Sequence, residues 1–341
     1  MVQASSALRC VNSLSVVRGI LPVVRWRSGC LTLRQMANRS AWLRATRWGN
    51  KRLIDASVSR RLGVAGYRAA VGLNRFLPPP RILLNGPSKS GTHLLSDCLA
   101  LLPKTMYSGR HFALAEFMRP TVDGRDGSDP PTSLDERALE RFLRRCPPGM
   151  FVTAHARFHP RLSQLLADLG YRQLLLLRDP RDIVMSFTRY VVSRPNHHRH
   201  QYYTQVLSTD DERIMATITG VPTLSPPLQP MHTTVDSYLP WGAEPSTLVC
   251  KFEDLVGPLG QGSAETQVAT VQAISQFLQR PIPLDHARAV ADKMYSKASL
   301  TYRKGAIGDW RSHFTPAHRQ TFKARAQGML MQLGYESNDD W

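Results

Sequence analysis

Short apolar runs alternate with longer amphipathic segments from about residue 80 to the end of the chain. The runs at 82–84, 150–157, 173–177 and 247–250 predict buried strands. Apolar positions recur at helical spacing in 94–102, 133–145, 161–169, 265–278, 284–293 and 316–333, which predicts helices. Ser133 is the expected N-cap of the second of these helices. Strands that alternate with helices indicate an α/β domain built on a parallel sheet.

Two long stretches lack a clear period. Residues 103–132 contain several glycines and prolines and are expected to be rich in loops. Residues 188–241 give weak signals, and 219–230, rich in Pro, Thr and Ser, are expected to form a loop. The stretch 103–132 fits either one wall of a substrate pocket or a plain surface loop, and its sequence does not separate the two.

A turn of small and polar residues joins the first strand to the first helix. It contains Gly86, Ser88, Lys89, Ser90, Gly91, Thr92 and His93. Glycines let backbone N–H groups converge, the helix start adds unpaired donors and a positive dipole end, and Lys89 adds a cation. The turn is therefore predicted to bind a phosphate-like anion.

The order of residues in this turn differs from that of the common nucleotide loop. A nucleotide-hydrolysing P-loop reads G-x-x-x-x-G-K-[ST], with lysine directly after the second glycine. Here Thr92 follows Gly91, and Lys89 stands two residues before that glycine. The order P-x-K-S-G-T resembles the 5′-phosphosulfate loop of the sulfotransferase family. Taken alone, the turn also fits a variant nucleotide P-loop or an ordinary glycine turn.

The net charge of +18 is concentrated in an N-terminal arm. Residues 1–80 hold fourteen Lys or Arg residues and one acid, Asp55, for a net +13, whereas the remaining 30 basic and 25 acidic residues give only +5. A nucleic-acid partner is therefore not inferred from the total. The five cysteines are scattered, with no C-x-x-C pair, which argues against a disulfide framework and a structural zinc site.

Three prolines, 78–80, end this arm, so residues 1–79 are assigned to a basic Arg-rich extension and 80–341 to one catalytic domain. The most apolar piece of the arm, 14–24, is interrupted by Arg18 and Pro22 and is too short to span a membrane. A cytoplasmic location is expected. The acid-poor composition also fits a transit peptide for a mitochondrion or plastid, or a surface helix in peripheral membrane contact.

The strand at 150–157 leads to a histidine. In a parallel α/β sheet, ligands bind at the carboxyl ends of the strands, so His155 is expected to face the site. The place resembles the strand of sulfotransferases that ends in the general base for the acceptor hydroxyl. The usual cytosolic pattern there is Lys-Thr-His, whereas this chain reads Thr153-Ala154-His155, so a second lysine is missing. A structural histidine is the alternative.

A charged R-D-P-R-D segment follows the strand at 173–177. Its first arginine, Arg178, stands eight residues before Ser186 in the next helix. This spacing resembles the sulfotransferase motif for the 3′-phosphate, and an arginine fork with a hydroxyl gives directional bonds to such a group. An ion-pair network that caps the helix is the alternative. The resemblance further implies that Ser186 restrains Lys89 until an acceptor arrives.

Two further segments extend the resemblance. Phe252 follows the last strand, where the family often has a tyrosine near the nucleotide. The segment 303–310, R-K-G-x-x-G-D-W, resembles the most specific sulfotransferase motif, in which Arg303, Lys304 and Gly305 would contact the 3′-phosphate. Histidines 197, 198 and 200 lack carboxylate or cysteine partners and are interpreted as part of a solvated loop.

Together these motifs predict an α/β fold of the P-loop nucleotide-binding type: one domain, with a parallel sheet flanked by helices, after the basic extension. The resemblance implies direct in-line transfer of a sulfo group from 3′-phosphoadenosine 5′-phosphosulfate (PAPS) to a hydroxyl, or less readily an amine, of a small-molecule or glycan acceptor, without a metal. His155, Lys89 and Ser186 would act in catalysis. The alternatives are a kinase on the same fold, with Asp179 or Asp254 as the magnesium ligand, and a non-enzymatic protein that binds nucleotides or polyanions.

Overall fold

A computed structural model describes residues 79–120, 132–295, 305–326, 328–338 and 340–341, all within one compact unit. The arm 1–78 lies outside these residues. The predicted boundary between residues 79 and 80, the cytoplasmic location and the alternatives for the arm therefore stay predictions. None of the helices in the described ranges is long and apolar enough to cross a membrane.

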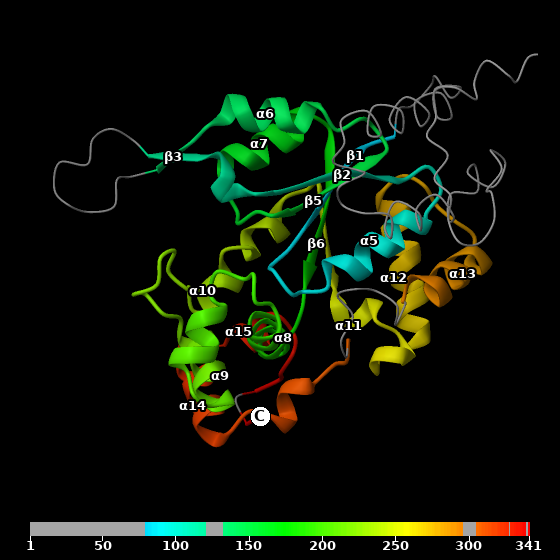
Figure 1. The fold of residues 1–341 in the computed structure, drawn as a ribbon. Coiled ribbons are helices and arrows are strands. Elements are labelled where there is room, and N and C mark those ends of the chain that lie inside the picture. Colours follow the sequence, from blue (N-terminus) through cyan, green and yellow to red (C-terminus); the bar gives the residue numbers. More distant parts are fainter. Residues whose placement is uncertain (1–78, 121–131, 296–304, 327, 339) are drawn as a thin grey trace, which may run out of the picture. The chain divides into compact units, whose positions relative to one another are not determined.

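The centre of the fold is a five-stranded sheet in the order β2-β5-β1-β6-β7 (Figure 1). Every neighbouring pair in this sheet is parallel, as the sequence predicts. Its strands are β1 (Arg81–Asn85), β2 (Met106–Ala113), β5 (Met150–His155), β6 (Tyr171–Leu177) and β7 (Thr247–Lys251). A small antiparallel hairpin pairs β3 (Met118–Pro120) with β4 (Thr132–Leu134).

Helices surround the sheet. They are α5 (Thr92–Leu101), α6 (Glu136–Arg144), α7 (Pro160–Asp168), α8 (Pro180–Val192), α9 (Asp210–Thr219), α10 (Met231–Asp236), α11 (Phe252–Leu255), α12 (Ala264–Phe277), α13 (Leu284–Met294), α14 (Pro316–Ala326) and α15 (Met329–Gln332). Short helical turns occur at Leu114–Phe117, Tyr202–Val206, Leu239–Ala243, Pro258–Gly260 and Asp309–Ser312.

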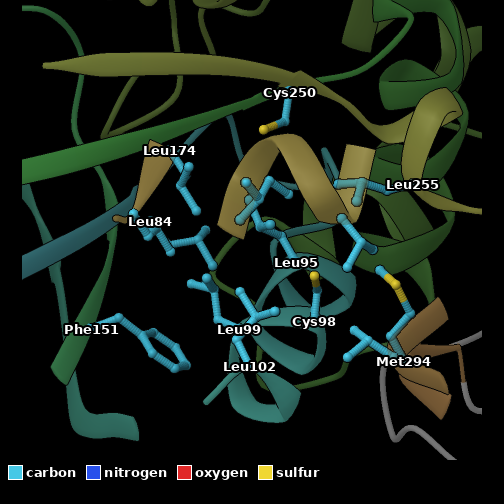
Figure 2. Packing of buried hydrophobic residues seen from close by; sticks show 14 of the residues in the cluster. Leu84, Leu95, Cys98, Leu99, Leu102, Phe151, Leu174, Cys250, Leu255 and Met294 are labelled. Carbon is cyan, nitrogen blue, oxygen red and sulfur yellow. The ribbon is translucent and has the colours of Figure 1, made fainter. Parts of the chain in front are cut away.

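Two hydrophobic clusters hold these layers together. In the first, Leu84 of β1 and Leu174 of β6 meet Leu95 and Leu99 of α5 (Figure 2), and residues of α12 and α13 belong to the same cluster. The second joins α8, α9, α10, α14 and α15 around the buried Trp310. Because strand side chains alternate between the two faces, burial of consecutive leucines in β1 and β6 requires helices on both sides of the sheet.

Three sequence predictions about local structure are wrong. Residues 106–113, expected to lie in a loop, form the edge strand β2, whose pairing with β5 shifts register between Tyr107 and His111. The N-cap of α6 is Asp135 rather than Ser133, because its carboxylate accepts the Ala138 N–H at 2.9 Å. The expected C-terminal helix is divided into α14 and α15, with Gly328 at a φ of 75° before the second.

Candidate functional site

The predicted anion loop connects β1 to α5 in a tightly folded turn. Lys89 and Gly91 both adopt left-handed conformations, with φ values of 71° and 101°. The Ser90 hydroxyl is buried and donates to the carbonyl oxygen of Pro87 at 2.8 Å. A Cβ on Gly86 would lie 2.4 Å from the Leu176 carbonyl oxygen, so only glycine fits against β6 there. The loop is thus held to the sheet at its start and wound around its own backbone.

The side chains of this loop differ in exposure. Ser88 is exposed, Lys89 is half-buried, and Thr92 begins α5, where His93 is again exposed. The Lys89 ammonium lies 4.0 Å from the centre of the Tyr190 ring, on α8. Tyr190 is one helical turn beyond Ser186, so the aromatic contact lies next to the serine that was predicted to restrain this lysine.

His155 lies at the carboxyl end of β5 and reaches the anion loop. Its Nδ1 lies 2.8 Å from the carbonyl oxygen of Gly86, so Nδ1 carries the proton and Nε2 keeps its lone pair. Burial lowers the pKa of His155 below its ordinary value, and the nearby charge of Lys89 lowers that pKa further. A neutral imidazole with an available Nε2 can accept a proton from a hydroxyl group.

Asn85, at the end of β1, fixes the backbone beside this histidine. The side-chain NH₂ of Asn85 donates to the Ala156 carbonyl oxygen at 2.8 Å, and the side-chain oxygen of Asn85 accepts the Ala156 N–H at 2.9 Å. The Trp241 indole donates to the same Ala156 oxygen at 3.0 Å. Because Ala156 follows His155 directly, these buried bonds set the direction in which the histidine leaves the sheet.

A second histidine, which the sequence analysis left in the loop-rich stretch 103–132 and did not count among the site residues, lies beside the first. The His111 ring on β2 meets the His155 ring edge to face, with 5.1 Å between their centres. Its Nδ1 lies 2.9 Å from the hydroxyl of Thr153, the residue at the place of the missing lysine. The strand pairing of β2 with β5 aligns His111 with Thr153, but β2 itself was not predicted, so the sequence held no signal for this contact.

Phe252 joins the anion loop to the predicted 3′-phosphate site. A Cβ on Gly91 would lie 2.4 Å from Cδ2 of Phe252, so the ring packs directly on this glycine. The Arg178 guanidinium stacks over the same ring, 4.2 Å from its centre. Arg178 also donates to the Ala306 carbonyl oxygen at 3.0 Å, while its buried Nε finds no acceptor in the described part of the chain. The Phe252 ring thus contacts both the anion loop and Arg178.

The structure describes two of the remaining predicted residues and leaves two others outside its described ranges. Ser186 is half-buried on α8, and Gly305 has a φ of 54°. Arg303 and Lys304 lie outside the described residues, so their proposed contacts stay predictions.

The second arginine of the R-D-P-R-D segment forms the ion pair considered as an alternative. Arg181 donates to both oxygens of Asp179, at 3.0 and 2.7 Å, and its guanidinium lies over the rings of both Trp310 and Trp341, 3.9 and 4.4 Å from their centres. The Asp179 carboxylate, one of the two candidate magnesium ligands, is therefore engaged by a buried arginine. In this segment Arg181 forms a structural ion pair, whereas Arg178 stacks on Phe252 and bonds to Ala306.

Histidines 197 and 198 stack on each other, with ring centres 4.6 Å apart, beside Arg199. Burial lowers the pKa of His197 to about 4, with further lowering by these charged neighbours. Within the described ranges, no group of three or more His, Cys, Asp or Glu side chains is arranged to hold a metal ion.

Comparison with known proteins identifies the family. No curated protein sequence matches the chain. Among solved structures, mouse sulfotransferase SULT7A1 complexed with PAP aligns with a TM-score of 0.51 at 17% identity, covering 74% of this chain and 85% of that chain. Retinol dehydratase in complex with androsterone and inactive cofactor PAP gives 0.49 at 17% identity, covering 75% and 82%. At such identity, the likeness to the mouse enzyme shows a shared fold.

The family model described as sulfotransferase domain matches residues 79–334. This match includes the anion loop, His155, Arg178 and Phe252, so it spans the site as well as most of the chain. It gives no support to the kinase or to the non-enzymatic alternative. The chain belongs to the sulfotransferase domain family.

Proposed function

We propose that this protein transfers a sulfo group from PAPS to a hydroxyl group, or less readily an amine, of a small-molecule or glycan acceptor. One observation carries the proposal: His155 bonds through Nδ1 to Gly86, the first residue of the anion loop. A neutral base is thereby fixed directly beside the loop predicted to hold the leaving phosphate. Passive binding of a nucleotide would not require a base in this position.

The residues present also fit the donor. PAPS carries one phosphate at the 5′ position of its ribose and another at the 3′ position. The anion loop is assigned to the 5′-phosphate and Arg178 to the 3′-phosphate, and Phe252 contacts both the loop and Arg178. The buried Arg178 Nε, which has no acceptor within the described ranges, is suited to a phosphate oxygen. Gly86 and Gly91 are both positions where a Cβ would collide with a neighbour, as a loop folded closely around an anion requires.

In the proposed mechanism, PAPS supplies an activated sulfo group, which passes from the 5′-phosphate to the acceptor oxygen. His155 Nε2 accepts the proton of the attacking hydroxyl, while Nδ1–H keeps its bond to Gly86. Lys89 and the N–H groups of the loop stabilise the negative charge on the departing phosphate. Arg178 and Ser186 orient the 3′-phosphate, and Phe252 provides an apolar surface for the base or sugar.

Thermal stability tests the donor assignment, because a ligand that binds only the folded state raises the melting temperature. We expect a rise with 3′,5′-adenosine bisphosphate (PAP), no comparable rise with ATP, and a smaller PAP effect in Arg178→Ala. Arg288→Ala, which removes an exposed arginine paired with Asp285, is the matched control and should respond like wild type. A rise with Mg-ATP alone would contradict the proposal in favour of a kinase.

Transfer itself is then measured with sulfur-labelled PAPS and a panel of phenols, alkanols, sugars and amines. Labelled product that depends on His155 supports the assigned chemistry. Donor binding without transfer to any hydroxyl or amine acceptor would contradict the enzymatic part of the proposal.

A further inference from the structure

A buried carboxylate lies beside the proposed 3′-phosphate site. Asp182, in the first turn of α8, has a side chain with 0% exposure. Its Oδ2 accepts the Gly308 N–H at 2.8 Å, and its Oδ1 accepts the Trp310 N–H at 3.1 Å. One carboxylate thus holds two backbone N–H groups of a segment that lies 126 to 128 residues further along the chain.

Arg178 contacts both Asp182 and the same distant segment. Its Nη2 lies 3.7 Å from Asp182 Oδ2 and donates to the Ala306 carbonyl oxygen at 3.0 Å. Ala306, Gly308 and Trp310 therefore contact either the arginine or the aspartate, and these two side chains contact each other. The position of Arg178 relative to 306–310 is fixed by three hydrogen bonds and one ion pair.

A negative charge at this place opposes the binding of an anion. Burial raises the pKa of Asp182 above its ordinary value, and Asp179 adds to this effect, whereas Arg178 and the N–H groups of Gly308 and Trp310 lower that pKa. A buried carboxylate is costly unless it is paired and hydrogen-bonded. The charge of Asp182 alone would weaken donor binding. What Asp182 contributes to the site is therefore the position of the groups that it contacts, Arg178 and the backbone of Gly308 and Trp310.

We propose that Asp182 is a positioning residue of the donor site, which aligns Arg178 with the segment 306–310 for recognition of a 3′-phosphate. The segment follows Arg303, Lys304 and Gly305 directly in the sequence, and Asp182 holds it at Gly308 and Trp310. This inference rests on the proposed function, since it assumes that Arg178 binds the 3′-phosphate of PAPS.

Asp182→Asn tests the role, because it keeps the size of the side chain and removes one acceptor. The amide oxygen can still accept one N–H, but the amide NH₂ then faces the second N–H, so 306–310 must shift. The ligands are PAP and 5′-AMP, which differ in the 3′-phosphate alone, and calorimetry measures both affinities. Asp285→Asn, on the exposed start of α13, is the matched control.

For Asp182→Asn we expect the PAP affinity to fall by about tenfold or more, as is typical for the loss of a charged hydrogen bond. The 5′-AMP affinity should change by less than about threefold, a difference that general destabilisation would not produce. An unchanged ratio of the two affinities would overturn the inference while leaving the proposed donor site intact. Failure of the wild-type protein to bind PAP would overturn both.

A measurement on the wild-type protein covers the case in which Asp182→Asn does not fold. In hydrogen exchange without ligand, the Gly308 and Trp310 amides should be protected, because Asp182 already accepts both of them. Rapid exchange at these two amides in the free protein, with protection only after PAP is added, would show that the ligand orders the segment. That result would also overturn the inference.

Discussion

The Nδ1 atom of His155 lies 2.8 Å from the carbonyl oxygen of Gly86, and this bond links two strands of the sheet through the site. His155 ends β5, whereas Gly86 directly follows the neighbouring strand β1. A carbonyl oxygen can only accept, so the bond selects the tautomer in which Nε2 is unprotonated. The same contact therefore defines the base and places it at the anion loop.

Replacement of this histidine should affect the transfer step and spare donor binding. We expect His155→Ala to lower kcat by about 10² to 10⁴, the usual value of a positioned acid–base group, with PAP affinity almost unchanged. Single-turnover transfer and calorimetry measure the two effects separately. A variant that keeps more than about a tenth of the wild-type rate would show that His155 is not the base.

The lowered pKa of His155 predicts the direction of the pH dependence. The imidazole acts as a base only when it is neutral, so the rate should rise with pH through the lowered pKa and then level off. The midpoint should lie below the ordinary histidine value of about 6.5. The pH profile of kcat/KM for the donor, from about pH 5 to about pH 9, measures it, because this ratio reports the groups of the free enzyme.

Two buried acids require a control in that experiment. Burial raises the pKa of both Glu253 and Asp182, so each can gain a proton in the acid range. PAP affinity is therefore measured over the same pH values. A midpoint above the ordinary histidine value, at constant PAP affinity, would contradict the environment described for His155.

The sequence predicted the parts of the fold that carry a strong pattern. Four strands of the central sheet are apolar runs, and α5 and α8 follow polar turns whose residue order is distinctive. The edge strand β2 was missed because Gly109, Arg110 and His111 interrupt its apolar positions where the register shifts. The α9 helix begins with a capping box of Thr209 and Glu212, which is a local sequence signal. No helix was predicted there, because the apolar pattern of 188–241 is weak.

For the site, spacing identified individual residues but could not identify the contacts between them. Arg178 and Phe252 were each predicted near the nucleotide, and the structure adds that they stack on each other. The contact of Lys89 with Tyr190 depends on how α8 packs, which no local pattern encodes. The same holds for Asp182, whose two backbone partners lie more than a hundred residues away.

The contact between Lys89 and Tyr190 should be measurable as a coupling energy. In a double-mutant cycle with Lys89→Met and Tyr190→Leu, we expect about 0.5 to 1 kcal/mol in the free energy of unfolding, because the pair is partly exposed. Tyr190→Phe keeps the ring and should retain most of this energy. Denaturant titration provides the values, and a coupling of zero would mean that the two side chains do not interact in solution.

Substitution of two glycines distinguishes the effect of backbone strain from the effect of a steric clash at the site. Gly91 and Gly170 both have positive φ values, of 101° and 65°, but an added Cβ at Gly91 meets Phe252 at 2.4 Å, whereas one at Gly170 meets nothing within 4 Å. Gly170→Ala should therefore cost about 1 to 2 kcal/mol of stability, the price of a left-handed backbone, and leave PAP affinity unchanged. Gly91→Ala should cost more and also weaken PAP binding, since the Phe252 ring must move away from both the loop and Arg178. Denaturant titration and calorimetry on the two variants test this, and equal PAP affinity in both would show that the contact of Phe252 with Gly91 does not shape the donor site.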